Sequence, residues 1–297
     1  MKMEFSAAES PFVWKLAAFF ELTRPGVTRS VVLTSAAGFY LGSSGRLDLL
    51  LLIHALVGTA LLSGGAAVLN QFIEREADGK MNRTCRRPLP SGRVSENDAV
   101  IAGGLLIVGG SLYLAFLTNI LAAFLGCFAS VVYLFVYTPL KMKTPFCTTV
   151  GAIPGAIPPL IGWAAASGQL DGNAFLLFAI IFAWQFPHFL AISWVHKEDY
   201  KRAGFAMLSS RDPDGRRTGR RILIFTVILL GLSVLPVTSG LTGMIYLVGA
   251  LVLGSVLLWF GFEAALARTK TAARHVLLAS VAYLPLLLML MVIDKNG

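Results

Sequence analysis

Residues 49–72 read LLLLIHALVGTALLSGGAAVLNQF, and His54 is their only titratable side chain. A helix of about 20 mostly apolar residues crosses the ~30 Å hydrocarbon core of a bilayer. We therefore predict a transmembrane helix at 48–72. Further stretches of the same kind lie at 27–45, 98–118, 120–138, 148–167, 172–195, 221–238, 241–262 and 274–293. The sequence predicts an all-α membrane protein with about nine transmembrane helices.

The composition of the whole chain agrees with this interpretation. Of the 297 residues, 56% are apolar and only 14% are charged, whereas roughly a quarter of a soluble domain is charged. So few charges cannot cover a surface that faces water, and most of the surface must face lipid. We expect a single transmembrane domain at 27–293, a cytoplasmic or interfacial segment at 1–26, and a short tail at 294–297.

The basic residues predict the orientation. If the N-terminus is cytoplasmic and the spans alternate, all but two of the 25 Lys and Arg lie on the cytoplasmic side, the exceptions being Arg46 and Lys295. Cytoplasmic loops attract Lys and Arg during insertion, so this asymmetry is a strong topological signal. It explains the net charge of +9, together with contact to anionic membrane lipid. We expect no nucleic acid partner.

The N-terminal segment indicates the compartment. Residues 12–22, FVWKLAAFFEL, predict an amphipathic helix on the cytoplasmic face. Residues 1–26 lack the uninterrupted apolar core of a signal peptide and are not rich in Arg and Ser like a mitochondrial transit peptide. We expect the plasma (inner) membrane of a bacterium.

Two cytoplasmic loops, at 73–97 and 196–220, are long and carry both signs of charge. Functional residues concentrate in such loops. At the first, Asn70, Glu74 and Asp78 recur every four residues, so a continuous helix would align them along ~12 Å of one face. Mg²⁺ usually binds one or two carboxylates together with substrate phosphates. Basic residues follow that could bind the remaining phosphate charge: Lys80, Arg83, Arg86 and Arg87.

The alternative for this loop is a solvated helix end whose acids and bases pair with one another. Asn70 and Glu74 adjoin an apolar span, where polar side chains are costly and tend to mark functional sites. This position favours a binding site over a solvated helix face.

The fifth span carries an unusual pattern of Gly and Pro, GAIPGAIPPLIG at 151–162. Broken backbone inside a membrane is tolerated only where it is buried in protein or lines a cavity. A kinked and tightly packed helix is the alternative. Tyr137 and Lys141 precede this span, at the cytoplasmic end of the fourth.

The sixth span ends in WQFPHF, residues 184–189, where Pro187 should bend the helix. Trp184 and His188 lie four residues apart and place an aromatic wall beside a titratable nitrogen. His188 either belongs to a site or satisfies the carbonyl that Pro187 frees. After the span, Asp199 mirrors Asp78 and is followed by Tyr200, Lys201 and Arg202.

Three stretches, in this order, carry a resemblance to a known family. They are NQFIEREADGKMNRTCRRPLPSG at 70–92, YTPLKMKTPFCTTVGAIPGAIPPLIGWAAASG at 137–168, and WQFPHF followed by AISWVHKEDYKRAGFAML up to residue 208. The chain resembles the intramembrane prenyltransferases related to 4-hydroxybenzoate polyprenyltransferase. Within that superfamily it is similar to the protohaem IX farnesyltransferases, also called haem O synthases. The layout of the spans extends the resemblance to nearly the whole chain.

This resemblance implies helices bundled around a central cavity with cytoplasmic cap loops. It implies transfer of farnesyl from farnesyl diphosphate to the 2-vinyl group of protohaem IX with addition of water, giving haem O, and a downstream haem A synthase as a further partner. It implies Mg²⁺ as the cofactor, held by Glu74, Asp78 and Asp199. The catalytic residues would be Asn70 and these three, and the substrate-binding residues Lys80, Arg83, Arg87, Tyr137, Lys141, Trp184, His188, Tyr200 and Lys201.

Two positions depart from the pattern of the wider superfamily. Glu74 stands where many members carry Asp. The second loop lacks a complete DxxxD motif, because Val195 stands four residues before Asp199. Haem synthases resemble this chain in lacking the first Asp, whereas an enzyme for a phenolic acceptor would be expected to have the full motif.

Loss of diphosphate from the donor would leave a farnesyl cation, which needs a dry pocket with aromatic faces. His188 is expected to meet the acceptor there, as a ligand of haem iron or a hydrogen-bond partner near the transferred carbon. The alternative of another class is a transporter, which would bind its cargo near the bilayer midplane, whereas the carboxylates here lie at the cytoplasmic edge. The aromatic candidates are Tyr133, Tyr137, Trp184, Phe186 and Phe189.

Overall fold

The computed structural model describes residues 11–296. Within this range the regular structure is helical, apart from one isolated bridge between Thr242 and Lys295. The predicted all-α class is confirmed. The first helices are α1 Pro11–Leu22, α2 Pro25–Gly42, α3 Leu49–Ile73, α4 Arg75–Gly79, α5 Glu96–Leu117 and α6 Ile120–Val131, which continues through the π-helix η1 Val132–Tyr137 into α7 Thr138–Leu140. The remaining elements are α8 Cys147–Ala156, α9 Pro158–Ser167, α10 Gly172–Val195, α11 Lys197–Arg202, the 3-10 turn η2 Ser209–Arg211, α12 Arg216–Thr238, α13 Met244–Ala267 and α14 Lys270–Ile293.

Eight of the nine predicted spans are helices, or pairs of consecutive helices, that are long and apolar enough to cross a membrane. The other, α2, lies beside them, but Thr28, Arg29 and Ser30 in its first turns make it too polar to qualify by composition. A total of nine spans therefore stays a prediction. Two boundaries differ from those expected: α12 begins five residues earlier than 221, and α13 runs to Ala267 rather than 262.

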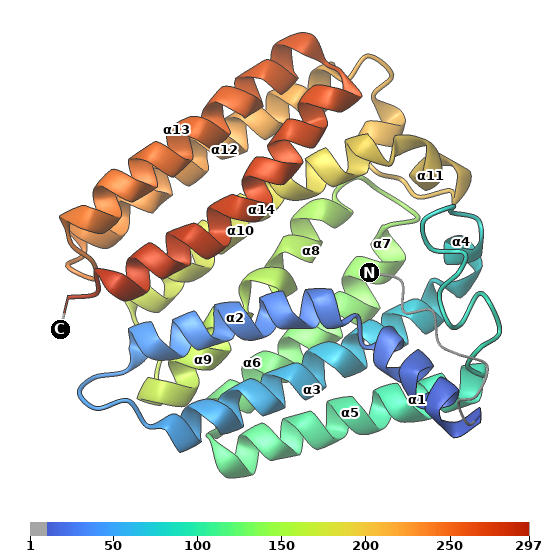
Figure 1. Ribbon diagram of the computed structural model, residues 1–297, viewed down its shortest axis with the longest axis horizontal. Coiled ribbons are helices and arrows are strands. Elements are labelled where there is room, and N and C mark those ends of the chain that lie inside the picture. Colours follow the sequence, from blue (N-terminus) through green and yellow to red (C-terminus); the bar gives the residue numbers. More distant parts are fainter. Residues whose placement is uncertain (1–10, 297) are drawn as a thin grey trace.

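The long helices form two groups that face each other (Figure 1). In the first group α3 packs on α5, and α2 packs on α9 and α3. In the second group α10, α12, α13 and α14 pack on one another. Contacts of α8 with α10 and of α2 with α14 join the groups. The cavity described below lies between them.

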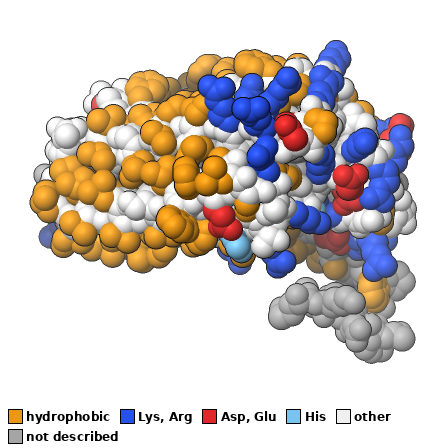
Figure 2. Space-filling model, turned by 90° about the horizontal axis from the view of Figure 1, so that it is seen from above, with side chains coloured by type: hydrophobic (Ala, Val, Ile, Leu, Met, Phe, Trp, Pro, Cys, Tyr) orange, Lys and Arg blue, Asp and Glu red, His pale blue; other side chains and the backbone are white. Residues whose placement is uncertain are grey.

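Charged side chains gather at one end of the molecule, while apolar ones cover the rest of the face that Figure 2 shows. This end, which we name the basic end, is formed by α4, α11 and the turn between α13 and α14 (Figure 1). Such a distribution is what an apolar belt facing lipid and a polar cap outside it require.

Helices α2 and α9 approach each other through two glycines. A methyl group on Gly38 would overlap the backbone carbonyl of Pro159, and one on Gly162 would overlap that of Ser35. Small residues at such positions let membrane helices come close enough for extensive van der Waals contact. The contact fixes α9 against α2 and holds one wall of the cavity in place.

Irregular backbone occurs where the sequence predicted it. The Gly- and Pro-rich stretch is divided at Ile157 into α8 and α9, and Pro154 lies inside α8. The fourth span contains the π-helix η1, in which the Thr138 hydroxyl donates to the carbonyl of Tyr133 at 2.8 Å. Helical segments of this kind occur frequently at functional sites.

The last described residues close the far end of the molecule. The Lys295 ammonium donates to the carbonyls of Tyr40 at 2.9 Å and Ser43 at 2.5 Å, where α2 ends. It also lies over the Tyr40 ring, 5.2 Å from the ring centre. Because helix carbonyls at a C-terminus lack intrahelical partners, a cation there satisfies them. The C-terminal tail thus ties α14 to α2.

Candidate active site

A cavity of about 340 Å³ lies between the two groups of helices, next to the basic end. Its walls come from α2, α3, α6 with η1, α8 and α10. The broken backbone of the fifth span borders it through Gly151, Pro154, Gly155 and Pro158, as the sequence predicted. Most of the lining is apolar. The charged residues of the lining are Arg24, Glu74, Asp78, Arg83, Arg87 and Lys141.

The acidic motif keeps its helical spacing but not a continuous helix. Helix α3 ends at Ile73 and α4 begins at Arg75, and Glu74 between them has φ −92° and ψ 4°. The Glu74 N–H still donates to the Asn70 carbonyl at 2.9 Å, and the Asp78 N–H to that of Glu74 at 2.8 Å. The three side chains therefore stay on one side of the chain, as expected.

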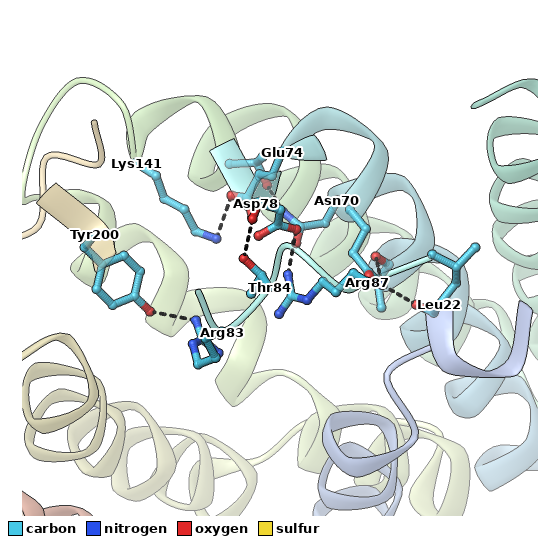
Figure 3. A network of polar contacts seen from close by, with 12 residues as sticks. Leu22, Asn70, Glu74, Asp78, Arg83, Thr84, Arg87, Lys141 and Tyr200 are labelled. Atoms are coloured by element: carbon cyan, nitrogen blue, oxygen red, sulfur yellow. Dashed lines mark hydrogen bonds and ion pairs between the residues drawn. The ribbon is translucent and has the colours of Figure 1, made fainter. Parts of the chain in front are cut away.

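Both carboxylates of the motif are buried and paired with bases, as Figure 3 shows. Glu74 lies 2.7 Å from the Lys141 ammonium, which comes from the turn after α7. Asp78 is 1% exposed and lies 2.6 Å from the Arg87 guanidinium. This self-pairing was the alternative weighed for the loop, but these pairs line a cavity instead of a solvated face. The burial of both acids favours a binding site.

Two buried acceptor atoms of this motif have no hydrogen-bond partner. They are Oδ1 of Asn70 and Oδ1 of Asp78. The amide of Asn70 donates to the Thr138 hydroxyl at 3.0 Å, which fixes the orientation of the side chain. Unpartnered buried acceptors cost free energy unless a cation or donor meets them. Together with Glu74, they form an oxygen-only set of the kind that suits Mg²⁺.

Lys141 is held as a cation. Its ammonium lies 4.5 Å from the centre of the Tyr137 ring and 5.8 Å from that of Phe205. Burial by itself would lower the pKa of Lys141, but the Glu74 carboxylate raises this pKa above its ordinary value. The side chain therefore keeps its positive charge at neutral pH.

Arg24 is a cavity residue that the sequence reasoning did not single out. It lies between α1 and α2 with φ +48°, a conformation that non-glycine residues seldom adopt. It forms no ion pair with any described residue, and its Nε atom is buried without a partner. Burial alone would lower its pKa, but Tyr133, Glu74 and Asp78 raise it. The only sequence signal was its position directly before Pro25, ahead of a span.

The cavity lining therefore carries four cations and two anions. Because Glu74 and Asp78 already pair with two of the bases, the surplus of positive charge rests on Arg24 and Arg83. Arg83 is exposed, donates to the Tyr200 hydroxyl at 3.5 Å and lies 6.0 Å from the centre of that ring. This contact links the first loop to α11 across the cavity mouth. The charge suits an anion such as a diphosphate.

The second loop contributes less to the cavity than the sequence suggested. Asp199 pairs with Arg202 at 2.7 Å, and neither Asp199 nor Lys201 is part of the cavity lining. Lys80 is exposed and also lies outside it. In the described part of the chain, no three His, Cys, Asp or Glu residues form a group that could hold a metal. The predicted three-carboxylate set of Glu74, Asp78 and Asp199 is thus not brought together.

Trp184 and His188 face α14 instead of the cavity. The Trp184 indole donates to the Ser280 carbonyl at 2.8 Å, and Nδ1 of His188 lies 2.9 Å from the Ser280 hydroxyl. The two rings stack at 4.7 Å, and neither residue lines the cavity. The hydrogen bond of His188 goes to a side chain of α14, and Pro187 lies inside the unbroken helix α10.

Aromatic side chains do reach the cavity from two other positions. Tyr133 and Tyr137 of η1 stack at 5.4 Å between ring centres, and Phe189 of α10 lines the opposite part. Phe186 is not a lining residue, because it stacks on Phe225 of α12 at 3.7 Å. Two polar lining residues were also not predicted: Gln185, which donates to the Ala152 carbonyl at 2.9 Å, and Thr148, whose buried hydroxyl has no partner.

Known proteins resemble this chain over most of its length. The protoheme IX farnesyltransferase of Solibacter usitatus (strain Ellin6076) is 46% identical over 288 residues, covering 94% of this chain and 99% of the relative. That of Koribacter versatilis (strain Ellin345) is 45% identical over 291 residues, covering 95% and 94%.

Solved structures share the fold at lower identity. A structure of digeranylgeranylglyceryl phosphate synthase has a TM-score of 0.79 and 18% identity, covering 94% of this chain and 98% of its own. A UbiA homolog from Archaeoglobus fulgidus bound to DMAPP and Mg²⁺ has a TM-score of 0.66 and 15% identity, covering 89% and 96%. Residues 31–289 match the UbiA prenyltransferase family. The chain belongs to the UbiA prenyltransferase family, and within it to the protoheme IX farnesyltransferases.

Proposed function

We propose that this protein transfers farnesyl from farnesyl diphosphate to the 2-vinyl group of protohaem IX, with addition of water, to give haem O. The reaction takes place in the inner membrane of a bacterium, with the N-terminus on the cytoplasmic side, and a haem A synthase consumes the product. The observation that carries the proposal is the 46% identity to a protoheme IX farnesyltransferase over 99% of that relative.

The cavity supports binding of a diphosphate at the basic end and of an apolar chain below it. Arg24, Arg83, Arg87 and Lys141 are the lining cations that can bind diphosphate oxygens. The apolar part of the lining continues to Leu62 and Ile161. A prenyl diphosphate has this same division between an anionic head and an apolar tail. A structural relative, the UbiA homolog bound to DMAPP and Mg²⁺, binds a ligand of this class.

The residues that would hold Mg²⁺ are Glu74 and Asp78, with the Asn70 amide oxygen beside them. When bound there, Mg²⁺ would neutralise the diphosphate and stabilise it as a leaving group. Two carboxylates are sufficient, because Mg²⁺ takes further oxygens from substrate phosphates and water. Asp199 is not needed for this set, which agrees with its position outside the cavity lining.

Bond cleavage occurs between C1 of the farnesyl chain and the bridging diphosphate oxygen. Lys141, Arg24 and Arg87 offset the negative charge that develops on the departing pyrophosphate. The faces of Tyr133 and Tyr137 stabilise the positive charge left on the farnesyl carbon. The apolar remainder of the lining keeps water from reacting with this carbon before the acceptor does.

The acceptor then supplies the electrons for the new bond. The terminal carbon of the haem vinyl group bonds to C1, and the positive charge moves to the vinyl carbon next to the porphyrin ring. A water oxygen adds to that carbon and loses a proton, which gives a hydroxyl. Farnesyl diphosphate, protohaem and water are thereby converted to haem O and pyrophosphate, with all atoms accounted for.

The test is to incubate the purified full-length protein with protohaem IX, farnesyl diphosphate and Mg²⁺ and to weigh the product. We expect a mass gain of one farnesyl group plus one hydroxyl, and release of pyrophosphate. In parallel, 4-hydroxybenzoate replaces haem as acceptor. Prenylation of the phenol with no change in haem would contradict the proposed acceptor, and absence of any pyrophosphate release would contradict prenyl transfer itself.

A further inference from the structure

A second concave surface lies on the outside of the molecule, between α13 and α14. Its volume is about 230 Å³, and Leu253 and Phe260 on α13 and Leu278 and Ala282 on α14 contribute to its lining. Leu278 is 58% exposed, so the groove is open to the surroundings of the protein. In a spanning bundle, these surroundings are the hydrocarbon of the bilayer.

The groove ends near the basic end in a pair of titratable groups. His275 is the polar residue at this end of the lining, and its Nδ1 lies 3.2 Å from both carboxylate oxygens of Glu263. His275 is thereby held in place, with its ring 5.7 Å from that of Phe260. Below this pair the described lining is apolar down to Tyr283, whose hydroxyl bonds to Ser233 inside the bundle.

Three bases lie in the turn directly beyond the groove: Arg268, Lys270 and Arg274. All are exposed, and none forms an ion pair with a described residue. Lys270 and Arg274 precede Leu278 at intervals of four residues on α14, so all three stand in one row along the helix. This row places two cations above a side chain that lines the groove.

Exposed bases elsewhere at the basic end are often matched by acids. Lys15 pairs with Asp98 at 3.0 Å, and Arg75 with Glu96 at 2.7 Å. An orientation signal during insertion needs only the presence of bases on one side. It does not require that three of them stay unpaired above an apolar groove, and this arrangement points to an anionic partner.

The backbone at Arg268 adds an independent observation. Among the described residues, only Arg24 and Arg268 have positive φ without being glycine, and Arg268 has φ +52°. Strained backbone of this kind is concentrated at ligand sites. Arg24 borders the cavity, and Arg268 stands at the head of the groove.

We propose that this surface binds one anionic phospholipid. An acyl chain lies in the groove between α13 and α14, and the phosphate of the headgroup contacts Arg268, Lys270 and Arg274. Anionic headgroups complement the unpaired bases, and acyl chains complement the apolar lining. The site is separate from the catalytic cavity and does not depend on the function proposed above.

The test measures how lipids stabilise the full-length protein in detergent. Phosphatidylglycerol and phosphatidylcholine with the same acyl chains are titrated while the thermal midpoint and the bound lipid, by native mass spectrometry, are recorded. We expect phosphatidylglycerol to raise the midpoint more than phosphatidylcholine. The double variant Lys270→Gln/Arg274→Gln should bind phosphatidylglycerol about 30-fold more weakly, given the contribution of each base near an anionic lipid.

Matched variants separate the site from general charge and bulk. Arg217→Gln/Arg221→Gln removes two exposed, unpaired bases with the same spacing on α12 and should keep wild-type lipid binding. Ala282→Phe fills the groove and should abolish the preference for phosphatidylglycerol, while Val281→Phe, outside the groove, should not. Equal binding of both lipids by the wild type, or equal losses in test and control variants, would overturn the proposal. Equal stabilisation by inorganic phosphate alone would also overturn it.

Discussion

Asp78 combines almost complete burial with an orphaned carboxylate oxygen, and its other oxygen is bound by Arg87. Asp78→Asn keeps the shape and removes the charge. We expect turnover to fall on the order of 10³-fold or more, because several kcal/mol of leaving-group stabilisation are lost with one metal-binding carboxylate. The measurement is haem O formation at saturating donor and Mg²⁺.

The matched control for Asp78 is Glu76→Gln, the same chemical change on an exposed residue of α4 outside the cavity lining. It should retain turnover close to that of the wild type. If Asp78→Asn were also active with its Mg²⁺ dependence intact, the acidic motif would be no more than a self-paired helix end.

Arg24 offers a second test at the level of single residues. Arg24→Gln should raise the KM for farnesyl diphosphate by roughly 10- to 100-fold, because a hydrogen bond to a charged group contributes about 1.5–3 kcal/mol. Steady-state kinetics with varied donor measures this change. Arg29→Gln, an exposed arginine on the same helix, serves as the control and should leave the KM unchanged. Equal KM values in both variants would exclude Arg24 from the diphosphate site.

At the level of elements, the contact between α2 and α9 depends on the absence of a side chain at Gly162. Gly162→Ala should lower the thermal midpoint in detergent, since overpacking a close contact costs typically 1–3 kcal/mol, about the stability of several ordinary surface contacts. Gly104→Ala on α5 is the comparison, because a methyl group there meets nothing within 4 Å. A midpoint equal in the two variants would mean that α2 and α9 can move apart without cost.

The elements were predicted better than their local irregularities and rotations. Length and hydropathy were enough to find the helices, and the Gly and Pro pattern located the division between α8 and α9. Nothing in the sequence indicated the π-helix that brings Tyr133 and Tyr137 together, because a π turn depends on packing against neighbouring helices. His188 shows the same limit, since the bond to Ser280 on α14 decides which way that face of α10 points.

The candidate site was predicted where function depends on local spacing. Asn70, Glu74 and Asp78 occupy one short segment, so their proximity followed from helical periodicity. Asp199 and Lys201 belong to another loop, and Asp199 turned to Arg202, three residues away, which the sequence does not exclude. Arg24 was overlooked because its importance comes from a long-range approach to Glu74 and Asp78, not from a motif of its own.

On the scale of the whole molecule, the confinement of bases to one end predicts the topology. Reporter fusions at Asn119 and Asp171 should score as external, and one at Asp214 as cytoplasmic, because insertion retains Lys and Arg inside. Paired reporters that are active only on opposite sides of the membrane provide the measurement. A fusion at Asp214 that scores as external would contradict the orientation and the total of nine spans.

The bond between Lys295 and the end of α2 has a practical consequence for handling the protein. Two carbonyls and one aromatic ring at the far end of the bundle depend on a side chain three residues from the last one in the sequence. An affinity tag or fluorescent protein joined directly at that point would pull on the clasp between the opening and closing helices. A flexible spacer, or a tag attached ahead of α1, leaves the clasp intact and is the better design for purification.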